Sequence, residues 1–294
     1  MPVPEMTSGL LGLRVADLQF WLDARAAGVR LTVPECYDQF MIHGEPGRGL
    51  TLHVRDGPPH CTDSWRSLFY DAETWQLWLD DVGRYVFAAP RHSLPSRQIA
   101  VDARFCAGEV TGEFGASAAA GRVIYPLQDI DIMILINWLA ESGDLTIHAG
   151  GIDDHGAGYA FVGPAGAGKS TLVAELAASS EVTVLGEDQV IVRYRDGQFW
   201  VYGTPWHTNP ARCSPGGIPL RKLFFLDRAL GHRVEPCGRM AGIEHLMQDA
   251  FIPYYNRAGT VRILDTLARM GELVPFYTIG FQMGADVAKL TREA

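Results

Sequence analysis

The second half of the chain alternates short apolar runs with stretches of helical periodicity. From Leu127 to Ser142 apolar residues recur at helical spacing, and Gly143 follows as a helix stop. Leu145–Ala149 and Gly158–Val162 predict two short strands, joined by the Gly- and Asp-rich turn Gly150–Gly156. The later predicted elements are a helix at Thr171–Ser180, strands at Val182–Leu185, Gln189–Tyr194, Phe199–Tyr202 and Leu220–Leu226, with a hairpin turn at Asp196-Gly197, helices at Ile243–Phe251 and Val261–Arg269, and a strand at Val274–Phe281. Alternating strands and helices predict an α/β domain.

The first third of the chain mixes short strand-like runs with turns and is rich in aromatic residues. Runs at Arg30–Val33, Leu50–Val54 and Tyr85–Ala88 predict strands. The aromatic side chains fit a core, or a surface that meets a partner, better than a site that stacks on a ligand. Ala107–Gly121 is rich in Gly, Ala, Glu and Ser and predicts a linker. We therefore predict a smaller α+β domain at residues 1–115 and the α/β domain at residues 116–294.

Composition and charge narrow the classes of partner. The chain has 294 residues, of which 47% are hydrophobic and 20% charged, as in an ordinary globular protein. Its net charge of −9 leaves no general basic field, so we expect no nucleic-acid partner. Any phosphate group must then be held locally. The chain contains three lysines, Lys169, Lys222 and Lys289, so each is a candidate for a specific role.

Five cysteines are scattered along the chain without a C-x-x-C pair. This spacing argues against a disulfide framework or a cysteine zinc site, and it favours reduced thiols in the cytoplasm. The first residues contain no basic segment followed by a long apolar core, so we expect no signal peptide. The longest apolar run, near Ile130–Leu139, is far shorter than the ~20 residues of a membrane-spanning helix. We expect a soluble cytoplasmic protein with no membrane partner.

The segment Gly163–Ser170 (GPAGAGKS) matches the phosphate-binding pattern G-x-x-x-x-G-K-[ST] at every fixed position. Its glycines let the backbone curl so that N–H groups point at phosphate oxygens. Lys169 supplies a positive charge to the β- and γ-phosphates, and the Ser170 hydroxyl can ligate Mg²⁺. The following helix directs its positive end at the same anion. The predicted cofactors are ATP and Mg²⁺, and the predicted nucleotide-binding residues are Gly163, Ala165, Gly166, Ala167, Gly168, Lys169, Ser170 and Thr171.

Two acidic residues, Glu187 and Asp188, follow the next predicted strand, at the end where α/β domains bind ligands. One carboxylate can hold Mg²⁺ and the other can accept a proton from an attacking hydroxyl. The sequence does not decide between them, so both are candidate catalytic residues beside Lys169. Asp188 and Ser170 are the candidate metal ligands. His148 lies on the predicted strand before the loop, where a single histidine is more often structural than functional.

These residues resemble the core of the HPr kinase/phosphorylase family. That family has a His-Gly-x-x-x-Asp strand, a returning strand and then the phosphate loop. The same order is present here in His148–Asp153 (HAGGID), Tyr159–Val162 (YAFV) and Gly163–Ser170. The resemblance spans about Leu127 to Leu226.

An acidic pair ahead of a Val-rich strand extends the resemblance. Here the pair is Glu187-Asp188, before Gln189–Val192 (QVIV), whereas the family has two aspartates. The resemblance implies an HPr-kinase-like (PEP-carboxykinase-like) P-loop domain. It makes His148 an active-site residue near the acceptor, and Glu187 and Asp188 candidates for proton acceptance and metal binding. Because HPr kinases are hexamers, a homo-oligomer is a further expectation.

The chain departs from the family after the acidic pair. HPr kinases carry a Glu-x-Arg-Gly-type signature linked to phosphorolysis, whereas this chain has Val201–His207 (VYGTPWH). The difference argues against phosphorolysis and against HPr as the substrate. The run is similar to HPr-kinase-like proteins of peptide natural-product clusters, including kinases that phosphorylate a serine of a lasso-peptide precursor. It favours a peptide, protein or small-molecule acceptor with a free hydroxyl.

Two classes of function remain open at this point. In the first, the protein is an ATP- and Mg²⁺-dependent kinase acting on a hydroxyl, with an arginine such as Arg212, Arg221 or Arg257 helping to neutralise charge. In the second, it is an ATP-binding regulatory or adaptor protein without phosphoryl transfer. A pure binder needs no acid–base residue beside the metal, so the acidic pair and His148 favour the kinase. A GTPase is disfavoured because the chain lacks an Asn-Lys-x-Asp motif.

Overall fold

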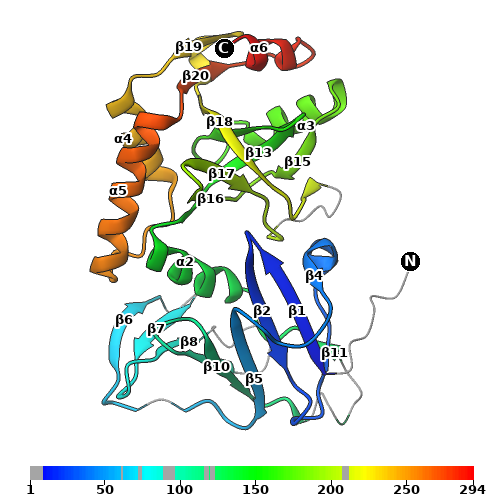
Figure 1. The fold of residues 1–294 in the computed structure, drawn as a ribbon, viewed down its shortest axis with the longest axis vertical. Coiled ribbons are helices and arrows are strands. Elements are labelled where there is room, and N and C mark those ends of the chain that lie inside the picture. Colours follow the sequence, from blue (N-terminus) through cyan, green and yellow to red (C-terminus); the bar gives the residue numbers. More distant parts are fainter. Residues whose placement is uncertain are drawn as a thin grey trace. The chain divides into compact units, whose positions relative to one another are not determined.

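The computed structural model describes residues 9–60, 62–71, 75–88, 97–115, 119, 123–206 and 212–294. The chain forms two compact units, Met1–Trp138 and Leu139–Ala294 (Figure 1). The division falls within α2 (Asp131–Ser142), later than the predicted boundary after residue 115. The start of α2 belongs to the first unit because the Asp131 carboxylate accepts hydrogen bonds from the hydroxyls of Tyr37 and Tyr125, at 2.5 and 2.8 Å.

In the described part of the first unit, nine strands form one mixed sheet in the order β4-β1-β2-β5-β10-β9-β8-β7-β6. The strands are β1 (Leu10–Val15), β2 (Leu18–Asp23), β4 (Met41–Ile42), β5 (Leu50–Asp56), β6 (Arg66–Tyr70), β7 (Gln76–Leu79), β8 (Tyr85–Ala88), β9 (Arg97–Val101) and β10 (Ala107–Gly112). A second sheet joins β3 (Arg30–Leu31) and β11 (Val123–Ile124), and the 3-10 helix η1 covers Glu35–Phe40. Phe20 and Trp21, two of the aromatic residues, are buried in the core of this unit.

The predicted linker is wrong over its first residues. Ala107–Gly112 forms β10, which lies inside the sheet between β5 and β9. A Cβ at Gly108 would come within 2.3 Å of the carbonyl oxygen of Ala100. The small residues of this segment therefore permit close strand packing rather than chain flexibility. Residues 116–118 and 120–122 of the predicted linker lie outside the described residues.

The second unit is built on a mixed sheet in the order β12-β16-β17-β18-β14-β13-β15, with β20 beside β18 and β19 beside β20. Its strands are β12 (Leu145–Ile147), β13 (Ala149–Asp154), β14 (Ala157–Val162), β15 (Thr183–Gly186), β16 (Val190–Arg195), β17 (Gln198–Tyr202), β18 (Gly217–Leu226), β19 (Arg233–Pro236) and β20 (Phe276–Gly280). Its helices are α3 (Lys169–Ser179), η3 (Arg228–Leu230), α4 (Arg239–Asp249), α5 (Arg257–Leu273) and α6 (Val287–Glu293). β14 and β20 run parallel to β18. The predicted mixed α/β character is confirmed.

Two predictions for this unit are wrong in detail. The predicted strand Leu145–Ala149 is interrupted at His148, which lies between β12 and β13. The predicted turn Gly150–Gly156 is mostly strand β13, and only His155 and Gly156 turn the chain. Cβ atoms at Gly150 and Gly151 would come within 2.6 and 2.7 Å of the Val173 and Val190 side chains. Close packing, rather than chain reversal, therefore explains these two glycines.

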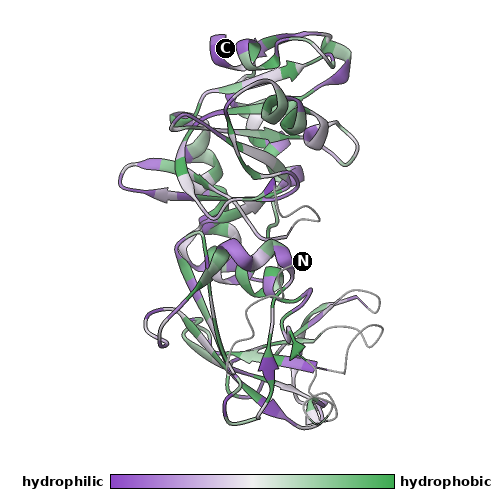
Figure 2. Ribbon diagram, turned by 90° about the vertical axis from the view of Figure 1, so that its right-hand side faces the viewer, coloured by the Kyte–Doolittle hydropathy of each residue, from purple (hydrophilic) through white to green (hydrophobic). Residues whose placement is uncertain are grey.

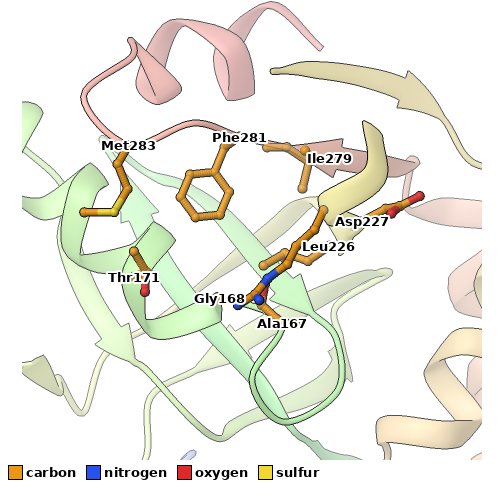
Figure 3. A pocket seen from close by; sticks show the side chains of 10 residues that line it. Ala167, Gly168, Thr171, Leu226, Asp227, Ile279, Phe281 and Met283 are labelled. Atoms are coloured by element: carbon orange, nitrogen blue, oxygen red, sulfur yellow. The ribbon is translucent and has the colours of Figure 1, made fainter. Parts of the chain in front are cut away.

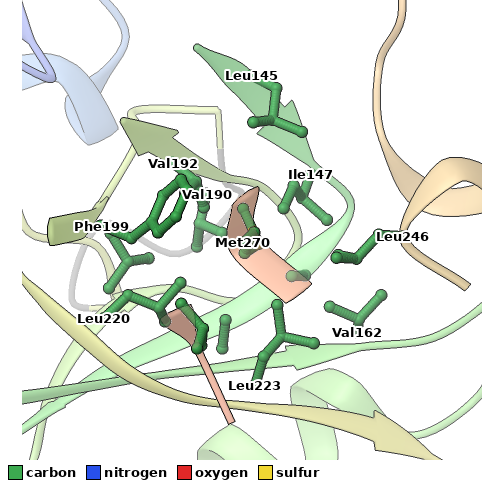
Figure 4. Packing of buried hydrophobic residues seen from close by; sticks show 14 of the residues in the cluster. Leu145, Ile147, Val162, Val190, Val192, Phe199, Leu220, Leu223, Leu246 and Met270 are labelled. Carbon is green, nitrogen blue, oxygen red and sulfur yellow. The ribbon is translucent and has the colours of Figure 1, made fainter. Parts of the chain in front are cut away.

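The sheet of the second unit carries a hydrophobic cluster on each face. Consecutive residues of β14 divide between the clusters: Ala160 and Val162 belong to one, Tyr159 and Phe161 to the other. This division follows from the alternation of side chains along a strand. The first cluster includes residues of α4 and α5, and Figure 4 shows its packing. The second packs α3 and α6 against the opposite face.

Hydrophobic and hydrophilic residues are interspersed along the ribbon of both units (Figure 2). Within the described residues, no helix is long and apolar enough to cross a membrane.

Candidate functional site

The segment between β14 and α3 is a phosphate-type loop in conformation as well as in sequence. β14 ends at Val162 and α3 begins at Lys169. Gly166 and Gly168 have φ values of +77° and +107°, in the left-handed region that favours glycine. The Ala167 amide donates to the Pro164 carbonyl at 3.0 Å, which closes the loop on itself. The sequence motif therefore stands in the strand–loop–helix setting that phosphate binding requires.

Lys169 lies inside the curve of this loop. Its residue is 5% exposed, and its ammonium donates to the carbonyls of Gly163 at 2.7 Å and Pro164 at 3.2 Å. Burial lowers the pKa of Lys169, while the negative charges of Asp188 and Asp249 act in the opposite direction. The lysine is therefore fixed at the loop and lies within electrostatic reach of two carboxylates.

The first turn of α3 presents the remaining predicted loop residues to solvent. Ser170 and Thr171 are exposed, as are Ala165 and Gly166 at the tip of the loop. No acidic residue lies in this first turn, so the positive end of the helix dipole is not neutralised locally. An anion can reach the loop from solvent.

His148 and Asp188 form a hydrogen-bonded pair. The Nε2 atom of His148 lies 2.8 Å from Oδ1 of Asp188, and the two side chains are 27% and 55% exposed. Asp188 follows β15, which is antiparallel to β13, and His148 immediately precedes β13. Neighbouring strands of the sheet thus bring together two residues that are 40 positions apart.

Glu187 has a different partner. An Nη1 atom of Arg212 donates to its carboxylate at 2.5 Å, and the Glu187 side chain is 16% exposed. Among the three candidate arginines, the described contacts join Arg212 to a predicted site residue. The two adjacent carboxylates are therefore differentiated: an arginine engages Glu187, and a histidine engages Asp188.

The segment that departs from the HPr kinase pattern supports the acidic pair. A Cβ at Gly203 would come within 2.3 Å of the Leu185 carbonyl oxygen, and the buried Thr204 donates to the Gln189 carbonyl at 2.8 Å. The segment thus contacts the backbone just before and just after Glu187-Asp188 in the sequence. His207 lies outside the described residues.

Asp249 is a further candidate site residue, which no sequence motif indicates. It is the last residue of α4, and its carbonyl accepts a hydrogen bond from the His148 amide at 2.8 Å. Burial raises the pKa of Asp249, whereas positive charge at His148, Lys169 and His245 lowers it. A carboxylate at the C-terminal end of a helix is unfavourable for the helix dipole, and that is the signal that could have drawn attention to it.

A pocket of about 370 Å³ adjoins the loop (Figure 3). The loop side contributes Ala167, Gly168 and Thr171. Figure 3 shows the Phe281 ring directed toward these loop residues. The opposite walls come from the ends of β18 and β20 and the residues that follow them: Leu226, Asp227, Arg228, Ile279, Gly280, Phe281 and Met283. No feature of the sequence motif indicates this pocket, because its walls come from segments more than 50 residues beyond the loop.

The donor set around the loop suits a weakly anchored Mg²⁺. Within the described ranges, no three His, Cys, Asp or Glu side chains are grouped to hold a metal. Mg²⁺ in phosphate sites usually keeps several waters and takes one or two protein oxygens together with phosphate oxygens. The Ser170 hydroxyl and the half-exposed Asp188 carboxylate match that requirement.

No family model matches this chain. No curated protein matches it either. Among solved structures, the chain is similar to the HPr(Ser) kinase/phosphatase from Coxiella burnetii, with 12% identity and a TM-score of 0.30, over 50% of this chain and 88% of that one. A likeness this low carries no argument about function.

Proposed function

We propose that this protein is an ATP- and Mg²⁺-dependent kinase that transfers the γ-phosphoryl group to a hydroxyl of its acceptor. The observation that carries the proposal is the arrangement of Lys169 inside a phosphate-type loop, within electrostatic reach of the His148–Asp188 pair. A protein that only binds nucleotide needs the loop and the lysine. It has no need for a carboxylate oriented by a histidine next to them.

The loop and Lys169 bind the phosphates. The present partners of the Lys169 ammonium are two neutral carbonyls, and hydrogen bonds to phosphate oxygens are stronger because both partners are charged. The ammonium therefore exchanges a carbonyl for the β- and γ-phosphates when ATP binds. The Ser170 hydroxyl and the Asp188 carboxylate would hold Mg²⁺, which would supply positive charge to these phosphates.

Asp188 accepts the proton of the attacking hydroxyl. The acceptor oxygen forms a bond to the γ-phosphorus while the bond from that phosphorus to the bridging oxygen breaks, and ADP leaves. The proton moves to the Asp188 carboxylate, which His148 orients through their hydrogen bond. Glu187 holds Arg212, whose guanidinium supplies positive charge to the transferring group. The two adjacent carboxylates thus have separate roles: Asp188 accepts the proton, and Glu187 holds the arginine that neutralises charge.

The finer parts of the proposal follow from the resemblance noted in the sequence. The second unit is the HPr-kinase-like (PEP-carboxykinase-like) catalytic domain, and the first unit recognises the acceptor. The acceptor is a serine of a peptide or protein, or a small-molecule alcohol, in the cytoplasm. The Tyr202–Trp206 run supports an acceptor other than HPr.

Calorimetric titration with MgATP tests the nucleotide-binding step. We expect Lys169→Ala to weaken ATP binding at least ~10²-fold, because it removes charge-assisted bonds to two phosphates. The matched control is Lys289→Ala, since Lys289 is 65% exposed and lies on α6. Circular dichroism shows whether both variants remain folded. ATP binding by folded Lys169→Ala at wild-type affinity would overturn the proposal.

A further inference from the structure

Arg228 is held firmly beside the phosphate loop by the strands behind it. It follows β18 as the first residue of η3. The preceding Asp227 is anchored on both sides: its amide donates to the Ile279 carbonyl at 2.9 Å, and its carboxylate accepts from the Ala229 amide at 2.8 Å. Gly280 lets η3 approach, since a Cβ there would come within 2.2 Å of the Gly231 carbonyl oxygen. The backbone at Arg228 is therefore fixed relative to β18 and β20.

The Arg228 guanidinium holds two carbonyls at the apex of the loop. Its Nε donates to the Ala167 carbonyl at 3.2 Å, and its Nη2 donates to the Gly166 carbonyl. In a trans peptide the carbonyl and the following N–H point in opposite directions. Drawing the Ala167 carbonyl toward Arg228 therefore turns the Gly168 N–H away from the Arg228 guanidinium. Likewise, the bond from Arg228 to the Gly166 carbonyl turns the Ala167 N–H away from the guanidinium, and this N–H donates to the Pro164 carbonyl.

In the part of the chain that the structure describes, no acid forms an ion pair with Arg228. Among the described residues, no carboxylate lies within ion-pair distance of its guanidinium. Arg228 is exposed, so removing it leaves no cavity in the core. Its positive charge adds to that of Lys169 and of the α3 N-terminus on an anion in the loop.

Arg228 also forms part of the pocket beside the loop. The wall facing the loop residues includes the apolar side chains of Leu226, Ile279 and Phe281. The Phe281 ring lies close to the loop, because a Cβ at Gly168 would be 3.6 Å from its Cε1 atom. A flat aromatic ring can stack on an aromatic side chain or on a guanidinium plane, and this pocket is lined by both Phe281 and Arg228.

We infer that Arg228 is a positioning residue that keeps the loop apex in its anion-binding shape, and that the adjoining pocket takes the aromatic base of the nucleotide by stacking on Phe281. This inference rests on the proposed function, and it adds the residue that joins the phosphate half of the site to the base half. The stacking pocket recognises the base through ring contact, whereas Arg228 acts on any ligand that enters the loop, with or without a base.

Binding of two ligands separates these roles: MgATP, and Mg²⁺-triphosphate, which has no base. We expect Arg228→Ala to weaken binding of both ligands by about tenfold or more, as for the loss of hydrogen bonds from a charged group. Arg228→Lys restores the charge without the two directed bonds and recovers part of the loss. Phe281→Ala weakens MgATP alone. The matched control is Arg233→Ala, because Arg233 is 63% exposed on β19 and pairs with Glu235.

The outcomes are distinct. Triphosphate binding unchanged in Arg228→Ala would overturn the positioning role. An equal effect of Phe281→Ala on both ligands, or none on either, would overturn the base site. Wild-type protein that binds neither ligand would overturn the proposed function itself, and the inference with it.

Discussion

Replacing Asp188 with asparagine separates its chemical role from its structural one. Asparagine keeps the size of the side chain and can still hydrogen-bond to His148, but it carries no charge and accepts no proton at neutral pH. The variant therefore leaves the geometry of the pair in place and removes the proposed proton acceptor. If the account is right, turnover falls while folding and nucleotide binding change little.

The structure predicts a small effect of this substitution on the free energy of unfolding and a large effect on the rate. The side chains of His148 and Asp188 are 27% and 55% exposed, so their pairing contributes at most about 1 kcal/mol to the free energy of unfolding. For a protein of this size, 1 kcal/mol corresponds to a change in Tm of roughly 2–4 °C. A positioned general base contributes ~10²–10⁴-fold in rate, or about 2.7–5.4 kcal/mol of activation free energy.

Single-turnover transfer of the label from γ-labelled ATP measures the rate, and calorimetry measures the ATP affinity of the same sample. We expect Asp188→Asn to reduce the rate by at least ~10²-fold. Its ATP dissociation constant should remain within about threefold of the wild-type value, and its Tm within about 4 °C. A rate within tenfold of the wild-type rate in a folded variant would refute Asp188 as the proton acceptor. A large loss of ATP affinity would instead make it primarily a metal ligand.

Three further variants test other parts of the site and fold. Glu187→Gln leaves Arg212 without its charged partner but keeps the proton acceptor, so we expect turnover to fall by only about tenfold, measured as above. Gly168→Ala forces a side chain onto a residue with φ of +107°, and we expect ATP binding at least ~10-fold weaker by calorimetry, because the strain of roughly 1–2 kcal/mol distorts the loop. Asp154→Asn removes the negative charge and one of the two oxygens that accept hydrogen bonds from Arg292, and these bonds lower the pKa of Asp154. A lowered carboxyl pKa stabilises the folded state at pH values above the unfolded pKa of about 3.9, so the variant loses about 1 kcal/mol of unfolding free energy at pH 7. The difference between wild type and variant shrinks as pH falls below about 4. A difference in denaturant midpoint that stays constant from pH 7 to pH 3 would contradict this.

The sequence predicts most elements of the second unit because their apolar periodicity is strong. Helix α3 and strands β16 and β17 appear within two residues of their predicted bounds. The hairpin turn between β16 and β17 has positive φ at Asp196 and Gly197, as its residue types indicate. The turn predicted at Gly150 and Gly151 is wrong, because a glycine required by packing and a glycine required by a turn look the same in a sequence.

Some residues of the candidate site could be predicted from a local motif, whereas others depend on contacts between distant segments. The loop from Gly163 to Thr171 is a continuous motif, so its residues could be assigned without a fold. The partners of the acidic pair could not be assigned, since Arg212 lies 25 residues beyond Glu187 and His148 lies 40 residues before Asp188. Asp249 and Arg228 reach the site only through the packing of α4 and the pairing of β18 with β20.

The central claim is that this protein transfers the γ-phosphoryl group of ATP to a hydroxyl, and product analysis tests it most directly. Wild-type protein and Lys169→Ala are incubated with γ-labelled ATP, Mg²⁺ and a panel of serine-containing peptides and small alcohols, including those encoded or made by neighbouring genes, and the products are examined by mass spectrometry. The account predicts that one acceptor gains the mass of a single phosphoryl group on a hydroxyl with the wild-type protein and not with the variant. Tight binding of ATP by the wild-type protein, with no acceptor labelled across the panel, would contradict the kinase assignment and favour an ATP-binding regulatory protein.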